Sequence, residues 1–336
     1  MNPKNPNKRA LKIIIALVVL VIVSMISLYL GSVKIPVGEI LTIFTSQNEA
    51  YKKIILDFRL PRLLNALIVG SSLSAAGIIL QSLLRNNLAE PGILGISAGA
   101  GLGAILVFIL PWSLSYYFLT PAAFIFAIGT TFLIFYIAKG ISNKYNNFIS
   151  TNKIILAGIA ISALFAAVNG FLLYIAGNSV TQIIFWLSGG LSGRGWNEFN
   201  FTIGFVVIGL VLSFFLSKEL NVLNLGEEMA SSAGLNLKRV QVLAIFVSAL
   251  LAASAVSVAG IITFVGLIIP NISKMIIGTD HRYTIPFSII AGSIFLVVSD
   301  IIARVVISPS ELPVGIITSF IGAPIFIWLI VKRQKG

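Results

Sequence analysis

Long apolar runs alternate with shorter polar segments along the whole chain, and this alternation predicts an all-α fold. The runs are about 18–25 residues long, which is the length of an α-helix that crosses a bilayer. Ten can be placed, near residues 11–30, 59–81, 93–110, 118–138, 154–176, 200–217, 240–258, 260–277, 284–304 and 313–331. We therefore expect a polytopic membrane protein with about ten transmembrane helices, in which residues 1–336 form one transmembrane domain.

Composition and charge agree with that class and orient the chain. The sequence is 57% hydrophobic and 10% charged, with a mean hydropathy of +1.02, which is more apolar than a water-soluble core requires. The net charge of +12 would suggest nucleic acid in a soluble protein, but here it reflects the Lys and Arg that hold loops in the cytoplasm. With the N-terminus inside, 16 of the 23 Lys and Arg residues fall in cytoplasmic segments. We expect both termini in the cytoplasm, no nucleic-acid partner, and a retained first helix rather than a cleaved signal peptide.

The polar segment at residues 218–241 interrupts the apolar pattern where the topology predicts the cytoplasm. Gly226 can open a short helix with Glu227 and Glu228 in its first turn, facing the positive end of the helix dipole. Gly234 suits the left-handed residue that ends such a helix, and Asn236 can cap the next one. An ordinary surface loop is the alternative to these two short helices. Four apolar side chains could face a partner, namely Leu223, Leu225, Met229 and Ala230.

Two further segments and one glycine repeat also predict structure. Residues 35–44 (IPVGEILTIF) predict an interfacial amphipathic helix on the outer side, and residues 181–187 predict a second short outer helix ended by two glycines. Gly95, Gly99 and Gly103 recur every four residues, a spacing that lets membrane helices approach closely. We expect these glycines to serve helix packing rather than chemistry.

Catalytic functions are disfavoured by what the chain lacks. Residues 95–99 match the G-x-S-x-G nucleophile pattern, but that pattern needs a strand-turn-helix elbow and a histidine partner. The only histidine, His281, falls on a predicted cytoplasmic loop. No Gly-Lys dipeptide occurs, so the chain has no Walker A loop and no ATPase site of its own. We expect no catalytic residue, no metal site and no cofactor.

Ion-coupled transport is disfavoured for a related reason. All 11 acidic residues are expected in loops or at span ends, whereas a secondary transporter usually has an ionisable group at mid-membrane. With one His, four Met and no Cys, the chain offers few ligands to a bare transition-metal ion. A wide, mostly uncharged path would suit a large cargo that carries its metal already chelated. A secondary transporter and an intramembrane enzyme remain alternatives of another class.

Several longer motifs follow one another through nearly the whole chain. They are RLPR at 59–62, RNNLAEP and GILG at 85–95, WLSGG at 186–190, LGE at 225–227, FVGLIIP at 264–270, DHR at 280–282, ELPVG at 311–315 and GAPIF at 322–326. In this order they resemble the FecCD-type permeases, the membrane subunits of type II ABC importers for iron-siderophores, haem and cobalamin. The chain departs from the family pattern at Asn87, where the family has proline, and at Asn271, where it has histidine, while Lys274 keeps a positive charge.

The resemblance implies an assembly and a cargo. Two permease subunits, identical or closely related, would enclose a path lined by the fifth and tenth spans in the cytoplasmic membrane. Two ATPase subunits would dock beneath them, and an extracytoplasmic binding protein would deliver the cargo. A siderophore is the expected cargo because it is the commonest in the family, with haem and cobalamin as alternatives. The ten spans and the motifs argue against a manganese- or zinc-type permease.

The resemblance also implies roles for individual residues. Thr151 and Asn152 would form a cytoplasmic gate, for which a plain helix cap is the alternative. Arg59, Arg62 and Arg304 would dock the binding protein at the outer surface. The alternatives for them are snorkelling to lipid headgroups, or pairing of Arg304 with Asp300 along one helix face. The element coupled to the ATPase would comprise Leu225, Gly226, Glu227, Glu228, Met229, Ala230 and Gly234.

Overall fold

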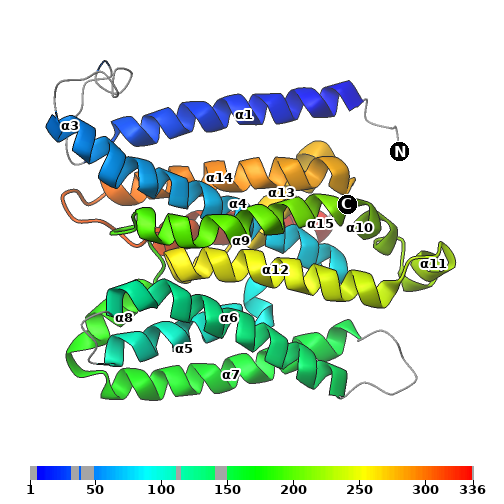
Figure 1. The fold of residues 1–336 in the computed structure, drawn as a ribbon. Helices are drawn as coiled ribbons and strands as arrows, with labels where there is room; N and C mark the ends of the chain where they lie inside the picture. The colour runs from blue at the N-terminus through cyan, green and yellow to red at the C-terminus, as the bar shows by residue number, and fades with distance from the viewer. Residues whose placement is uncertain (1–5, 32–37, 39–48, 111–114, 141–149, 335–336) are drawn as a thin grey trace.

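Eight long helices dominate the computed structural model, which describes residues 6–31, 38, 49–110, 115–140 and 150–334. All eight are long and apolar enough to cross a membrane, and they run roughly parallel to one another (Figure 1). No strand occurs among the described residues, so the predicted all-α fold is confirmed. The eight are α1 (Pro6–Tyr29), α4 (Leu60–Leu83), α6 (Ser115–Gly140), α7 (Thr151–Ile175), α9 (Trp196–Phe215), α12 (Leu237–Ala259), α14 (His281–Val305) and α15 (Val314–Gln334).

All ten predicted spans coincide with helices, but two of these helices are short. The spans at 93–110 and 260–277 correspond to α5 (Ile96–Ile109) and α13 (Val265–Ile277), which have 14 and 13 residues. At 1.5 Å per residue each is about 20 Å long, which is less than the roughly 30 Å hydrocarbon core of a bilayer. Ten membrane crossings and cytoplasmic termini therefore stay predictions.

Shorter elements lie at both ends of the bundle (Figure 1). One end, here called the α8 end, carries α3 (Glu49–Lys53), the π-helix η1 (Ile54–Arg59), the 3-10 turn η3 (Gly177–Ser179) and α8 (Val180–Leu187). The other, here called the α11 end, carries α10 (Ser217–Leu223) and α11 (Glu227–Ser232), together with the start of α1 and the end of α15. The helix predicted at 181–187 is confirmed as α8. The one predicted at 35–44 lies outside the described residues apart from Gly38.

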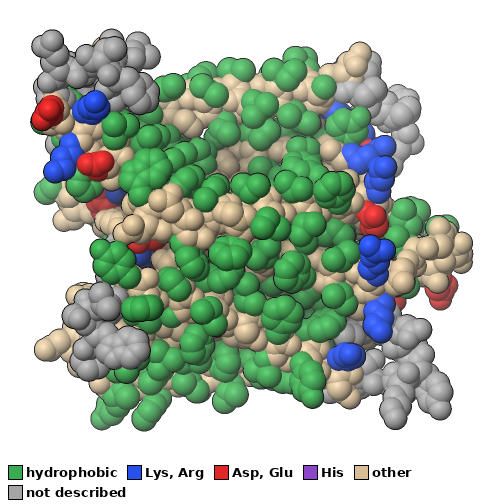
Figure 2. All heavy atoms as spheres, in the orientation of Figure 1, with side chains coloured by type: hydrophobic (Ala, Val, Ile, Leu, Met, Phe, Trp, Pro, Cys, Tyr) green, Lys and Arg blue, Asp and Glu red, His purple; other side chains and the backbone are tan. Residues whose placement is uncertain are grey.

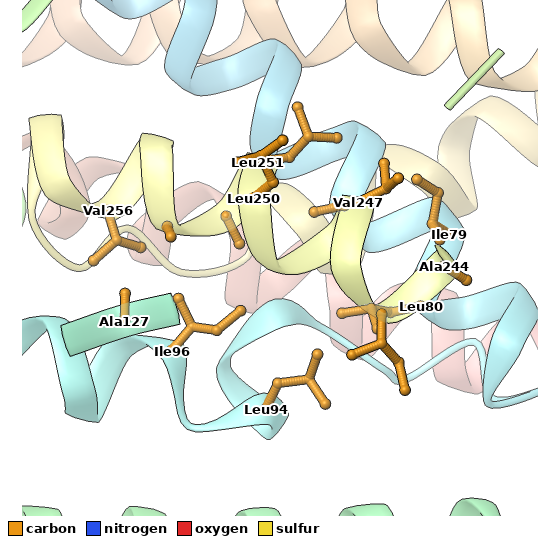
Figure 3. Packing of buried hydrophobic residues seen from close by; sticks show 14 of the residues in the cluster. Ile79, Leu80, Leu94, Ile96, Ala127, Ala244, Val247, Leu250, Leu251 and Val256 are labelled. Atoms are coloured by element: carbon orange, nitrogen blue, oxygen red, sulfur yellow. The ribbon is translucent and has the colours of Figure 1, made fainter. Parts of the chain in front are cut away.

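Helix α4 forms the centre of the bundle. It packs against α9, α12, α13 and α14, and nearly all of its side chains are buried. Its apolar residues meet those of α12, of α6 and of the turn before α5 in one continuous core (Figure 3). The labelled members of that core are Ile79, Leu80, Leu94, Ile96, Ala127, Ala244, Val247, Leu250, Leu251 and Val256.

Glycines set how closely the helices approach. A Cβ on Gly77 of α4 would fall on the backbone of Gly266 in α13, and one on Gly70 would fall on the backbone of Gly292 in α14. The predicted packing role of the glycine repeat in α5 is also confirmed, because a Cβ on Gly103 would meet the Ala122 carbonyl oxygen of α6 at 2.7 Å. Small residues of this kind allow membrane helices to touch backbone to backbone.

The connection from α4 to α5 folds back into the middle of the bundle. It contains the 3-10 turn η2 (Pro91–Leu94), and Pro91 fits against Gly266 at the level of Leu73, halfway along α4. The preceding residue, Glu90, accepts a hydrogen bond from the backbone N–H of Phe264, the N-cap of α13. Glu90 thus lies in a connection between helices, as predicted for the acidic residues, and the expectation that none lies at mid-membrane stays a prediction.

The surface reflects the membrane setting. Figure 2 shows a broad band of hydrophobic side chains across the helices, with charged side chains gathered towards the two ends. The outermost helices carry most of this apolar surface, since only 11% of the apolar stretch of α1 and 17% of that of α7 are buried, against 83% for α4 and for α12. Helices α1 and α7 therefore present faces that suit lipid or another protein subunit.

Candidate functional site

The segment between α9 and α12 folds largely as the sequence predicts. Gly226 is the N-cap of α11 with a φ of 111°, a backbone conformation that favours glycine. Gly234 follows α11 with a φ of 82°. The Asn236 side chain accepts a 3.0 Å hydrogen bond from the backbone N–H of Arg239 at the start of α12. These contacts are local in sequence, which explains why sequence rules could find them.

The same segment exposes only part of its predicted contact surface. Leu225 and Met229 are each 63% exposed and point away from the bundle, as a docking surface requires. Leu223 and Ala230, in contrast, are 2% and 0% exposed because they pack the segment against the rest of the protein. The expectation that all four could face a partner is wrong for these two. The exposed pair lies in or next to α11 (Glu227–Ser232), a helix that Figure 1 shows at one end of the bundle.

An ion pair ties the first turn of α11 to the end of α4. Arg85, which follows α4, places its Nη2 atom 2.5 Å from Oε1 of Glu227. Both side chains are partly exposed, so the pair adds little to stability. It nevertheless connects the proposed coupling element to the residue that follows the central helix α4.

The two departures from the family pattern contact each other. The Asn271 side chain donates a 2.9 Å hydrogen bond to the backbone carbonyl of Asn87. Lys274 donates to the Asn87 side-chain oxygen at 3.0 Å and to Gln81 at 2.9 Å. Sequence alone could not pair these positions, because 184 residues separate Asn87 from Asn271. The substitutions thus form one polar contact between the connection after α4 and helix α13.

The three arginines predicted for docking come together near the α8 end, but Arg59 is buried and the other two are only slightly exposed. Arg59 is 7% exposed, and the side chains of Arg62 and Arg304 are 13% and 7% exposed. Arg62 binds Asp300 at 2.8 Å and Glu311 at 2.9 Å, and Arg304 lies 3.1 Å from Asp300. The pairing of Arg304 with Asp300 along one helix is therefore confirmed, whereas exposure of the arginines at the surface is not observed.

These arginines also hold the end of α1. Arg59 donates to the backbone carbonyl of Tyr29 at 2.9 Å, and Arg304 donates to the Ser27 hydroxyl at 2.8 Å and to the Leu30 carbonyl at 3.1 Å. A cavity of about 490 Å³ opens beside the cluster, lined in part by the three arginines and Glu311. A side chain from outside that enters this cavity would meet the cluster.

The predicted gate residues begin α7 at the α11 end. Thr151 is half-buried and Asn152 is exposed. The residue before them, Ser150, is the N-cap of α7, but its side chain makes no capping hydrogen bond. The plain-cap alternative is thus not supported by a capping bond, and the gate itself stays a prediction.

An uncharged groove runs along α15. It has a volume of about 610 Å³ and lies between α15, the end of α8 and the segment before α13. Its walls are apolar and hydroxyl-bearing, with Thr263 and Ser319 in hydrogen-bond contact at 3.0 Å. The lining residues are Leu187, Ser188, Ile261, Thr263, Gly315, Ile316, Ser319, Phe320, Ala323 and Pro324. A groove of this chemistry suits a bulky neutral or chelated solute better than a bare ion.

Fold and site together define a polytopic membrane protein of the permease class, with an uncharged groove and a surface helix pair at one end. The model of the FecCD transport family matches residues 19–332, and the chain belongs to this family.

Individual relatives agree over nearly their whole length. The hemin transport system permease protein HmuU of Yersinia pestis is 35% identical over 325 residues, which cover 95% of each chain. The vitamin B12 import system permease protein BtuC of Vibrio parahaemolyticus is 38% identical over 323 residues, which cover 94% of this chain and 95% of BtuC. A solved structure, described as an inward-facing conformation of a metal-chelate type ABC transporter, has a TM-score of 0.83 and 31% identity, and covers 95% of this chain.

Proposed function

We propose that this chain is the membrane-spanning subunit of an ABC importer that carries a chelated iron compound, most simply a siderophore, across the cytoplasmic membrane. The observation that carries the proposal is the family match over residues 19–332, together with relatives named for hemin and vitamin B12. Haem and cobalamin are the alternative cargoes. The uncharged groove along α15 supports a solute whose metal is already enclosed by a chelator.

The proposed assembly follows from what the chain presents and lacks. Membership of the FecCD family supports two separate ATPase subunits as the source of energy, and the sequence itself contains no Walker A loop. A second permease copy, identical or closely related, covers the exposed faces that enclose the path, and an extracytoplasmic binding protein delivers the cargo. Residues 1–336 act as one permease unit.

Reconstitution tests this function directly. We expect liposomes that hold the permease with its ATPase subunits to take up a ferric siderophore only when the binding protein and ATP are both present. Haem and cobalamin are offered in parallel, so that uptake of one of them identifies the cargo. Uptake driven by a proton or sodium gradient without ATP would contradict the proposal and favour a secondary transporter.

The coupling proposal concerns Leu225 and Met229, the exposed apolar pair at α11. We expect Leu225→Asp and Met229→Asp each to weaken ATPase binding roughly tenfold, because a charge in a buried interface position removes apolar contact and adds a desolvation cost. Uptake should fall with it, while membrane insertion stays normal. The matched controls Leu225→Met and Met229→Leu keep the apolar surface and should behave as wild type. ATPase binding and cargo uptake at the wild-type level in both aspartate variants would refute this role.

The gate proposal concerns Thr151 and Asn152 at the start of α7. We expect Thr151→Trp and Asn152→Trp to block uptake by filling the constriction, while binding-protein docking on the other side of the membrane is unchanged. Thr151→Val serves as a control because it keeps the side-chain volume. The measurement is cargo uptake into liposomes alongside binding of the binding protein, and uptake by both tryptophan variants at the wild-type rate would show that these residues do not line the path.

The docking proposal now depends on the cavity beside Arg59, Arg62 and Arg304, which an acidic side chain of the binding protein would enter. Glu311 already binds Arg62 and is partly exposed, so it competes with such a side chain. We expect Glu311→Gln to strengthen docking and to steepen its dependence on salt. Asp57→Asn, an exposed acid lining the same cavity, is the control for a general charge effect. Equal salt slopes for both variants would leave the arginines with a purely internal role.

A further inference from the structure

Helix α10 is attached to the bundle by polar as well as apolar contacts. Leu220 and Leu223 anchor it in the core, with exposures of 0% and 2%. On the same helix, the side-chain oxygen of Asn221 accepts a 2.9 Å hydrogen bond from the backbone N–H of His281 and lies 2.7 Å from its ring Nδ1. The side-chain nitrogen of Asn221 donates to Asp280 at 2.8 Å.

His281 continues this contact into α4. It was expected on a cytoplasmic loop, but it is the first residue of α14 and is 1% exposed. Its second ring nitrogen, Nε2, lies 2.5 Å from the hydroxyl of Ser82 near the end of α4. Ser82 and His281 are 199 residues apart, so neither sequence pattern nor local rules could place them together. The three side chains connect α10, α14 and α4.

The charge of Asp280 fixes the direction of the hydrogen bonds that Asn221 makes. The hydrogen bond from Arg282 lowers the pKa of Asp280 to about 2, so this carboxylate is ionised at neutral pH and can only accept. The amide nitrogen of Asn221 must therefore face Asp280, and its oxygen must face His281. An oxygen there requires a proton on Nδ1. The other ring nitrogen, Nε2, lies within hydrogen-bond distance of the Ser82 hydroxyl, which also donates to the Ile78 carbonyl at 2.8 Å. A series of hydrogen-bond contacts thus connects Ser82, His281, Asn221 and Asp280.

We propose that Asn221, His281 and Ser82 are positioning residues that transmit movement of the coupling segment into α4 and α14. The inference rests on the proposed function, in which α10 and α11 receive the force of ATP hydrolysis. Helix α10 packs against α4, α11 and α14, so it lies between the exposed coupling surface and the buried helices. Hydrogen bonds add direction to this contact, because they fix the rotation of α10 about its axis in a way that leucine packing does not.

The simplest alternative is that leucine packing alone transmits the movement and the polar chain only stabilises the fold. The two explanations predict different effects when two contacts are removed together. Links in series fail together once one is broken, whereas independent stabilising contacts add their effects. The two explanations also predict different ratios of ATP hydrolysis to transport. Loss of stability lowers transport and hydrolysis in parallel, whereas loss of transmission lets hydrolysis continue without transport.

The experiment measures ATP hydrolysed per cargo molecule imported by the complete reconstituted transporter. We expect Asn221→Leu and Ser82→Ala each to raise this ratio about threefold or more, the effect of losing one buried hydrogen bond, and the double variant to raise it no further than the larger single effect. His281→Gln keeps an amide near the Nε2 position, so its ratio of ATP hydrolysed to cargo imported should be closer to the wild-type value than that of His281→Leu. The matched control is Asn224→Leu, because Asn224 is exposed at the end of the same helix.

Different outcomes would contradict the positioning role and the proposed importer function. A wild-type ratio in both Asn221→Leu and Ser82→Ala, an equal rise in Asn224→Leu, or additive effects in the double variant would overturn the inference while leaving the importer intact. Failure of the wild-type complex to couple uptake to ATP would instead overturn the proposed function. Ser82→Ala removes one buried oxygen and adds no volume, so it provides the test even where Asn221→Leu fails to assemble.

Discussion

Backbone contact around α4 is the constraint on which the rest of the structure depends. Gly70 and Gly77 of α4 meet Gly292 of α14 and Gly266 of α13 with no room for a Cβ atom. In a bilayer, helices gain little from burying apolar surface, so close van der Waals packing of this kind must hold them together. A side chain at any of these positions would push a neighbour outward. The gap would propagate through the core around α4, because α12, α13 and α14 all pack on that one helix.

Charged side chains inside the bundle connect elements and do not line the groove. Asp300 lies between Arg62 and Arg304, of which Arg304 also binds the end of α1. Glu90 accepts a hydrogen bond at the start of α13. Each of these buried charges thus has a partner, as the low polarity of the surroundings demands. The groove along α15 is left with hydroxyl and apolar groups only. This division of roles fits a path that moves a large solute without binding it through charge.

Sequence reasoning succeeded where the determining contacts are local. The glycine and asparagine signals at Gly226, Gly234 and Asn236 correctly predict the start of α11 and the cap of α12, because each acts within a few residues. Hydropathy correctly places every long helix for the same reason. Burial of individual side chains could not be predicted in this way. Whether Leu223 is buried and Leu225 exposed depends on where α10 meets α4 and α14, which no local pattern encodes.

In the candidate site, too, sequence reasoning predicted some features and missed those that depend on distant contacts. Motif resemblance pointed to the proposed coupling segment and to three arginines that the structure brings together, and a spacing of four residues predicted the Asp300–Arg304 pair. Resemblance did not find that Arg59 is buried, that Asn87 and Asn271 touch, or that His281 bridges two helices. Each of these facts depends on residues more than 100 positions apart. No signal in a single sequence reports such a distance, and only the assembled bundle brings the partners together.

The shortness of α5 and α13 limits the order in which the helices of this protein can insert into the membrane. Neither helix is long enough to cross a bilayer alone, and the non-helical backbone beside each one would be exposed to lipid if no other helix covered it. A newly made chain must therefore insert its long helices first and bring the connection at Pro91 against Gly266 only afterwards.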